Sequence, residues 1–176
     1  YISLCTKNLG MRLAWGDTEE PASFHKPTYN NSAIGKKYPW VIANNDTDAR
    51  NLNKEDDIVQ LNWPSGWYIP TAKDFDELRK NTTITKETID GHTWFRLTGK
   101  NGNSILIPGT NYIDNADNTE KWGSDTYLQS CTIGPSGSEP KQYALNINSD
   151  GKASLASGAG RATGLMIRPV KYVRIQ

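Results

Sequence analysis

A change in the hydrophobic pattern near Asn81 sets the fold class of this chain. Before it, Thr71 is a good helix cap, because its hydroxyl can accept from the first free amides. Phe75 and Leu78 then repeat at helical spacing with charged residues around them, which predicts an amphipathic helix over 71–80. After Asn81 the period becomes two, as in half-buried strands. Because the helical signals come early and the strand signals late, we expect an α+β fold with an antiparallel sheet.

Turn residues divide the strand-forming half of the chain into hairpins. One strand pair is expected around the Asn-Gly turn at 99–103, and a second around the turn at 149–151. A last strand is expected over 164–173, where Pro169 requires an edge position or a bulge.

The first 50 residues give weaker signals. Pro, Gly and Asn residues interrupt every sustained period, and only the short apolar pieces at 11–15 and 38–42 suit strand fragments or loops pinned by an aromatic. A short helix is expected after Asn53, because acidic residues fill its first turn and Ile58 and Val59 follow.

Composition excludes several classes of function. The 176 residues suffice for one well-buried domain, so we expect a single domain over 1–176. A net charge of +1 provides no basic excess for nucleic acid or for an anionic membrane surface. No apolar run approaches the roughly 20 residues that a membrane helix needs. The sequence begins at Tyr1 without an initiator Met, so we expect that any signal peptide has been removed.

Two cysteines, Cys5 and Cys131, lie far apart in the sequence. No Cys-x-x-Cys pair and no neighbouring His is present, so neither a zinc site nor a thioredoxin-type redox pair is expected. A disulfide between them in an oxidising compartment and two buried free thiols both remain open.

A series of short motifs extends over nearly the whole chain. They are Ala-Trp-Gly-Asp-Thr at 14–18, Glu-Asp-Asp-Ile at 55–58, Gly-Trp-Tyr-Ile-Pro-Thr at 66–71, the Phe and Leu at 75–78, Asn-Gly-Asn-Ser-Ile-Leu-Ile-Pro-Gly at 101–109 and Gly-Leu-Met-Ile-Arg-Pro-Val at 164–170. In this order they resemble the major paralogous domain first noted in Fibrobacter succinogenes, which is abundant in surface and secreted proteins of gut Bacteroidetes. The chain departs from the family at 125–130, where Asp-Thr-Tyr-Leu-Gln-Ser replaces a Tyr-Trp-Ser-Ser-Ser segment, and before Leu13.

The resemblance implies a C-type-lectin-like fold. Such a fold has a small antiparallel sheet, one or two helices and long loop regions, and the irregular region usually binds the ligand. We expect the loop-rich ligand region at about 114–141. The helix start at 69–71 is also similar to that of formylglycine-generating enzymes. Within the Gly-Trp-x-x-Pro-Thr motif, we expect Trp67 to pack under the sheet while Pro70 and Thr71 start the helix.

No metal or other cofactor is expected. The carboxylates at 55–57 would point in different directions on a helix, so a solvated run that starts the helix is favoured over a calcium site. The segment at 146–151 resembles the front of an EF-hand loop but lacks its terminal Glu, which favours a hairpin turn. Lys141 replaces the Asn of the Glu-Pro-Asn motif of sugar-binding lectins, so calcium-dependent sugar binding is disfavoured.

No enzymatic motif is found. His25 and His92 have no nucleophile at a known spacing, and the chain contains no Gly-x-Ser-x-Gly, His-Glu-x-x-His or P-loop segment. Cys131 lies late in the chain, as the reactive cysteines of formylglycine-generating enzymes do, but it is alone there. We therefore expect that the protein is not an enzyme.

Candidate ligand-binding residues lie in and beside the expected loop. Aromatic rings offer apolar area at little entropic cost, and polar neighbours fix orientation. Trp122 could instead be a core residue that holds the loop down, and both interpretations are kept. The candidates are Tyr112, Trp122, Asp125, Tyr127 and Gln129.

These observations favour a bacterial adhesion or recognition module at the cell surface, exported and anchored through another segment, with a glycan or a protein as its ligand. A structural or assembly module, such as a fimbrial tip subunit, is the alternative. An enzyme of the formylglycine-generating type and a hypervariable ligand-binding domain of the retroelement-diversified kind are further alternatives. No nucleic-acid partner and no membrane insertion are expected.

Overall fold

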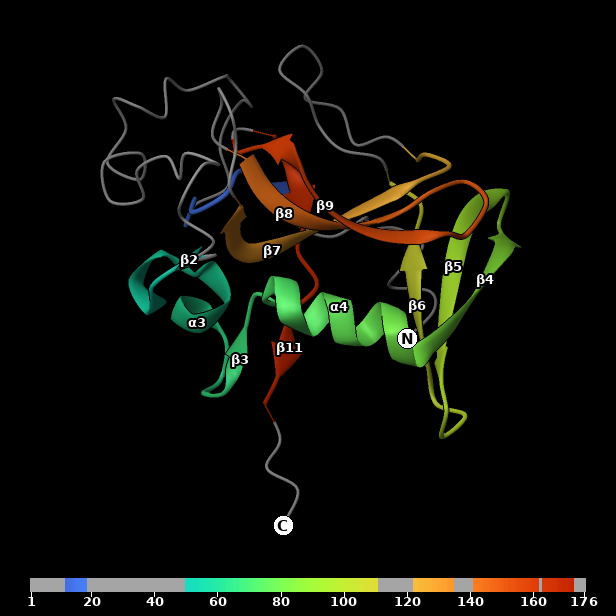
Figure 1. The fold of residues 1–176 in the computed structure, drawn as a ribbon, viewed down its shortest axis with the longest axis horizontal. Helices are drawn as coiled ribbons and strands as arrows, with labels where there is room; N and C mark the ends of the chain where they lie inside the picture. Colours follow the sequence, from blue (N-terminus) through green and yellow to red (C-terminus); the bar gives the residue numbers. More distant parts are fainter. Residues whose placement is uncertain (1–11, 19–49, 111–121, 135–140, 162, 173–176) are drawn as a thin grey trace.

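A computed structural model describes residues 12–18, 50–110, 122–134, 141–161 and 163–172 of the protein (Figure 1). The described chain is mixed α+β, with mostly strands in small sheets that are largely antiparallel, and this confirms the expected fold class. Its helical elements are a 3-10 turn (Lys54–Asp56), α3 (Ile58–Asn62) and α4 (Ala72–Asn81). Its strands are β1 (Arg12–Leu13), β2 (Arg50–Asn51), β3 (Trp67–Tyr68), β4 (Thr82–Ile89), β5 (His92–Gly99), β6 (Ser104–Pro108), β7 (Thr126–Gly134), β8 (Lys141–Ile147), β9 (Ala153–Gly160), β10 (Leu165–Met166) and β11 (Val170–Lys171).

The largest sheet is built around β7. Its strand order is β1-β10-β7-β8-β9, and β2 adds to β7. Every pairing in this sheet is antiparallel except that of β10 with β7, where Met166 lies opposite Leu128 in a parallel arrangement. Helix α4 contacts β7, β8 and β9, and so covers one face of this sheet (Figure 1).

Two smaller sheets flank α4. The first is the meander β4-β5-β6, and the second is the ribbon β11-β3. The hairpin of β5 and β6 turns at the Asn-Gly pair, and that of β8 and β9 turns at 149–151, so both expected hairpins are confirmed. The hairpin of β4 and β5 was not expected. It turns at Asp90 and Gly91, both of which have positive φ, as a tight hairpin turn requires.

The expected last strand over 164–173 is wrong as a single element. It is divided into β10, which joins the large sheet, and β11, which pairs with β3. Pro169 lies between the two and has no N–H to donate, so one continuous ladder is interrupted there. The expected strand fragment at 11–15 is present as β1, whereas the piece at 38–42 lies outside the described residues.

The helix expected over 71–80 is confirmed as α4. Thr71 is its N-cap and forms a capping box with Asp74: the Thr71 Oγ1 accepts from the Asp74 N–H at 3.1 Å, and the Thr71 N–H donates to Asp74 Oδ2 at 2.8 Å. Phe75 is buried on the inner face. The helix start is therefore fixed by local chemistry, as the sequence indicated.

Two apolar clusters form the described core. One joins α3 to the start of β1 and to β7, and the other lies between α4, β5, β7 and β8. The first contains Leu13, Trp15, Leu52, Ile58, Val59, Ile69, Cys131 and Ile133, with Trp67 packed against it. The second contains Phe75, Phe95, Leu97, Ile107, Leu128, Leu145, Ile147 and Met166. Because β7 contributes to both clusters, it connects the two halves of the core.

The acidic run at 55–57 starts a helix as expected, and Glu55 is exposed, but the run is not solvated at Asp57. Asp57 is only 1% exposed and caps α3, where its Oδ1 accepts from Val59 N at 2.9 Å and Gln60 N at 3.2 Å. Its second oxygen accepts from Ile69 N at 3.0 Å, twelve residues away. The carboxylate can be buried because backbone amides satisfy both of its oxygens. It joins α3 to the segment that leads into α4.

Replacing Asp57 with Ala is expected to lower the free energy of unfolding by about 3 kcal/mol. It removes a helix cap worth ~1 kcal/mol and deprives the buried Ile69 N–H of a charged acceptor, worth about 1.5–3 kcal/mol. Urea denaturation followed by circular dichroism measures the change. Asp150→Asn, in an exposed turn, should stay within about 0.5 kcal/mol of wild type. A loss of only about 0.5 kcal/mol for Asp57→Ala would contradict the role of this carboxylate in joining α3 to Ile69.

Candidate functional site

The loop-rich ligand region expected at 114–141 is wrong over 126–134. These residues form β7, which lies between β8 and β10 and is buried on both faces. Three of its four buried polar side chains are compatible with burial because they bond to partners in other segments. Ser130 Oγ donates to Tyr143 O at 2.7 Å, and Thr132 Oγ1 donates to Asn51 Oδ1 at 2.5 Å. A polar composition therefore does not make this segment a loop.

Of the five candidate residues, Tyr112 lies outside the described residues, and Gln129 cannot serve as a surface contact. Gln129 is 1% exposed, and its Nε2 donates to the backbone oxygen of Leu13 at 2.6 Å. Asp125 and Tyr127 are half-buried at the start of β7, where the Asp125 backbone oxygen accepts from Thr110 N at 2.9 Å. None of the described candidates lines the groove that the structure shows between α4, β6 and β11.

Trp122 packs against other aromatic rings. Its ring stacks on His92 with centroids 3.9 Å apart and an interplanar angle of 14°, and it lies 5.6 Å from the ring of the buried Trp94. Beside it, Gly123 N donates to Gly109 O at 2.9 Å. A Cβ on Gly109 would lie 2.5 Å from Gly123 O, so the two backbones approach as closely as they do only because Gly109 has none. These contacts support the interpretation of Trp122 as a residue that holds this segment against β5.

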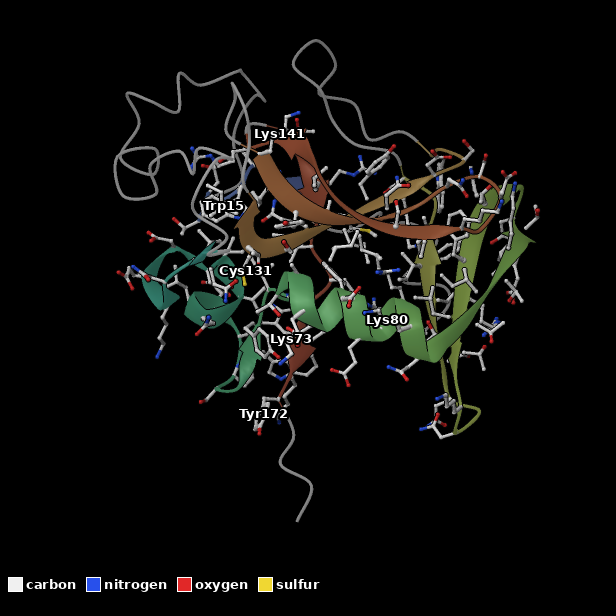
Figure 2. The ribbon with its side chains drawn as sticks, in the orientation of Figure 1. Trp15, Lys73, Lys80, Cys131, Lys141 and Tyr172 are labelled. Carbon is white, nitrogen blue, oxygen red and sulfur yellow. The ribbon has the colours of Figure 1, made fainter. Side chains whose placement is uncertain are left out.

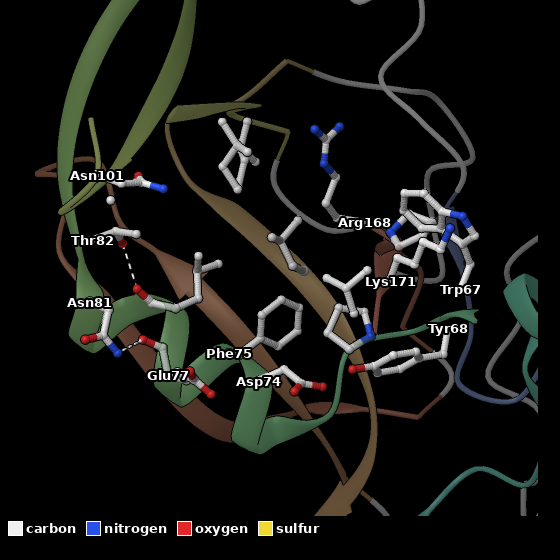
Figure 3. Close-up of a pocket in the computed structure, with 18 of the residues that line it drawn as sticks. Trp67, Tyr68, Asp74, Phe75, Glu77, Asn81, Thr82, Asn101, Arg168 and Lys171 are labelled. Atoms are coloured by element: carbon white, nitrogen blue, oxygen red, sulfur yellow. Dashed lines mark hydrogen bonds between the residues drawn. The ribbon is translucent and has the colours of Figure 1, made fainter. Parts of the chain in front are cut away.

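A groove of about 990 Å³ lies on another part of the molecule, between α4, the meander β4-β5-β6 and the ribbon β11-β3 (Figure 3). Its floor is apolar and is formed by Phe75 and Leu78 of α4, Ile107 of β6 and Leu128 of β7. In Figure 3, Trp67 and Lys171 lie on one side of Phe75 and Asn101 lies on the other. The groove therefore brings together segments from four separate parts of the sequence.

One end of the groove is aromatic. Trp63 and Trp67 have ring centroids 5.3 Å apart at an interplanar angle of 60°, and Trp63 remains 48% exposed. Gly66 between them has a φ of +92°, a conformation that favours glycine and lets the chain turn into β3. Tyr68 follows in β3, and its pKa is raised, first by burial and then by the neighbouring carboxylate of Asp74. The phenol therefore stays protonated over the neutral range.

The rim of the groove carries more accessible positive than negative charge. Arg168 and Lys171 lie at the aromatic end, and Lys100 lies on the β5–β6 turn. All three are exposed, and none forms an ion pair within the described part of the chain. Glu77 is exposed on the helix side, whereas Asp74 is occupied by the capping box. The available charge on the rim is suited to an acidic group on a ligand.

The described residues offer few groups for catalysis or metal binding. Among them, no cluster of three His, Cys, Asp or Glu side chains could hold a metal ion. In the segment at 146–151, Asn148 Oδ1 accepts from Asp150 N at 3.1 Å and from Lys152 N at 2.9 Å, which is the chemistry of the expected turn. Cys131, which belongs to β7, is a buried free thiol (Figure 2). Cys5, the other cysteine of the disulfide that the sequence left open, lies outside the described residues.

The groove was not predicted from the sequence. Trp67 was expected to pack under the sheet, whereas its ring both packs against the first core cluster and lines the groove. A signal was present, because Trp63, Trp67 and Tyr68 occur within six residues beside Pro64 and Gly66. What the sequence did not indicate is that the opposite wall comes from β6.

Comparison with protein-family models, with curated proteins and with solved structures finds no match to this chain. No described helix has both the length and the hydrophobicity to cross a bilayer. The groove and its charges are therefore the observations from which a function can be argued.

Cys131 is expected to react very slowly with iodoacetamide in the folded protein. Burial, and then the carboxylates of Asp57 and Asp74, raise the pKa of this thiol to about 12, so at pH 8 the reactive thiolate is about a thousandfold scarcer than for an ordinary thiol. Alkylation of the Cys5→Ser variant, followed by mass spectrometry, isolates Cys131. The same variant in 6 M guanidinium serves as the control and should alkylate within minutes. Equal rates in the two conditions would show that the thiol is not buried.

Proposed function

We propose that the chain is a recognition module of an exported surface protein, with a C-type-lectin-like fold and no enzymatic activity, and that it holds a glycan or protein ligand in the groove beside α4. The observation that carries this proposal is the groove itself, an apolar depression of about 990 Å³ with an aromatic pair at one end, of which Trp63 is exposed. Ligand sites are usually concave and largely apolar, with a few polar groups that fix orientation. The cell-surface location is supported only by the resemblance of the sequence motifs.

The groove is built on rigid elements, which favours recognition. Helix α4 begins with a capping box and is braced by Asp76, which pairs with both Arg79 and Lys80 on its outer surface. The β3 wall is held by Asp57 through Ile69. A site that is formed before the ligand arrives loses little entropy on binding. The alternative of an assembly module would use the same groove to hold a neighbouring subunit.

Trp63→Ala is expected to weaken ligand binding at least tenfold. Exposed aromatic residues at the edge of an apolar depression are typical of residues that dominate binding energy. Because Trp63 is half exposed, the protein should remain folded. The measurement is the binding of fluorescently labelled protein to a glycan array and to an array of random dodecapeptides, with the affinity for the strongest hits determined in solution.

Trp122→Ala is the matched control, since it removes the same kind of side chain from a position beside His92 that does not line the groove. It should leave the affinity within about twofold at a temperature where thermal melts show both variants to be folded. Loss of binding in Trp122→Ala with full binding in Trp63→Ala would move the site to the segment before β7 and contradict the proposal.

A further inference from the structure

The β6 wall of the groove has a free strand edge. Within the meander, Gly109 N donates to Thr93 O at 2.8 Å, and Gly99 N donates to Asn103 O at 2.9 Å. Hydrogen-bonded pairs alternate in an antiparallel ladder, so the odd-numbered residues of β6 bond to β5. The backbone N–H and C=O groups of Ser104 and Leu106 therefore point away from β5. In the described part of the chain, neither residue's backbone groups have a hydrogen-bond partner.

The opposite wall has a second free edge, on β11. Tyr172 N donates to Gly66 O at 3.1 Å, which fixes the pairing phase of the ribbon. By the same alternation, the backbone groups of Lys171 point away from β3. Figure 1 shows β11 on the side of β3 that faces β6, and residues of both strands line the one groove. The groove therefore has apolar side chains on its floor, and two of the strands that contribute to its lining, β6 and β11, have unpaired edges.

The polar side chains of the lining are already used locally. Asn81 Nδ2 donates to Glu77 O at 2.9 Å, and Thr82 Oγ1 donates to Leu78 O at 2.7 Å (Figure 3). Asn101 Oδ1 accepts from Asn103 N at 3.0 Å. A saccharide needs convergent side-chain donors and acceptors for its hydroxyl groups, and each of these three residues already uses one of its polar groups within the chain. Apart from the charged side chains of the rim, the strands beside the groove offer unpaired backbone groups, which match another extended chain.

We propose that the ligand of this groove is an extended segment of another protein chain, which adds as a β-strand to the free edge of β6. The proposal rests on the proposed function and names its ligand class. Alternate side chains of the added strand would point to the accessible apolar side chains of the lining, Leu78, Ile105 and Val170, so they are apolar. An acidic residue of the segment lies opposite Arg168 and Lys171, whose charges are free.

The experiment uses a phage-displayed library of random dodecapeptides, selected on the whole chain and counter-selected on its Leu106→Pro variant. Proline at 106 removes one outward N–H and leaves the pairing with β5 intact, since that N–H takes no part in the ladder. Selected sequences should alternate apolar residues and carry an acidic residue. Fluorescence anisotropy with one selected synthetic peptide should then show at least a tenfold rise in Kd for Leu106→Pro.

Two matched variants separate the edge from other effects. Leu106→Ala removes the side chain but keeps the N–H, and it should bind within about threefold of wild type. Thr88→Pro places a proline at an outward-facing position of β4, the far edge of the same meander, and should not change the Kd. The peptide methylated at alternate backbone nitrogens should not bind. An Arg168→Glu variant should bind the acidic peptide at least fivefold more weakly and regain affinity when the acidic residue of the peptide is replaced by Lys.

The outcomes distinguish this proposal from the proposed function. If no peptide is selected, or if Leu106→Pro and the methylated peptide bind normally, while a glycan is bound in a manner that depends on Trp63, the strand proposal is overturned and the proposed function stands. If neither peptides nor glycans bind in a manner that depends on Trp63, both are overturned. If the chain forms a dimer in sedimentation equilibrium that Leu106→Pro abolishes, the occupant is a second copy, and the proposal of a different partner fails.

Discussion

The carboxylate of Asp57 holds together the part of the structure on which the groove depends. It bonds to amides at the start of α3 and to the amide of Ile69, and the residue after Ile69 continues the connection, because Pro70 O accepts from Cys131 N at 2.8 Å. Thr132 Oγ1 then accepts from the Ala72 N–H at 2.9 Å, at the first turn of α4. The buried carboxylate thus begins a series of contacts that fixes α3, β3, β7 and α4 relative to one another.

Strand β7 shows how a polar segment becomes the centre of a core. Its sequence, Thr-Tyr-Leu-Gln-Ser-Cys-Thr-Ile-Gly, alternates poorly and contains four hydroxyl or amide side chains that are buried. The partners of Gln129 and Thr132 lie more than 80 residues earlier in the sequence, in segments beside β7 in the folded chain. The bonds of Gln129, Ser130 and Thr132 offset the cost of burying these groups, and they restrict the strand to one register, because a shift would leave the three side chains without partners.

The parts of the fold that were predictable from sequence are those fixed by local chemistry. The capping box of α4 and the turns of two hairpins depend on residues within a few positions of one another. The hairpin of β4 and β5 was predictable in the same way, because Asp-Gly is a turn signal and the segment Thr82–Ile89 before it has an alternating pattern that was not used. The burial of Asp57 and the position of β7 could not be predicted, because their partners are distant in sequence. The groove was missed for the same reason: Trp67 and Ile107 are 40 residues apart and become neighbours of one depression only after α4 has packed on the large sheet.

An open apolar groove between two strand edges raises the question of why the fold does not close it. Both walls are anchored away from the groove: β6 by its full pairing with β5 and by the contact of Gly109 with Gly123, and β11 by its pairing with β3. Closing the gap would require one of these sheets to detach from the core cluster beneath it. The strand edges and the ring of Trp63 therefore stay exposed, because the scaffold that holds them is rigid, and this exposure costs free energy in the unbound protein. Such a cost is offset when a ligand covers them, and a rigid site gives that ligand a defined register.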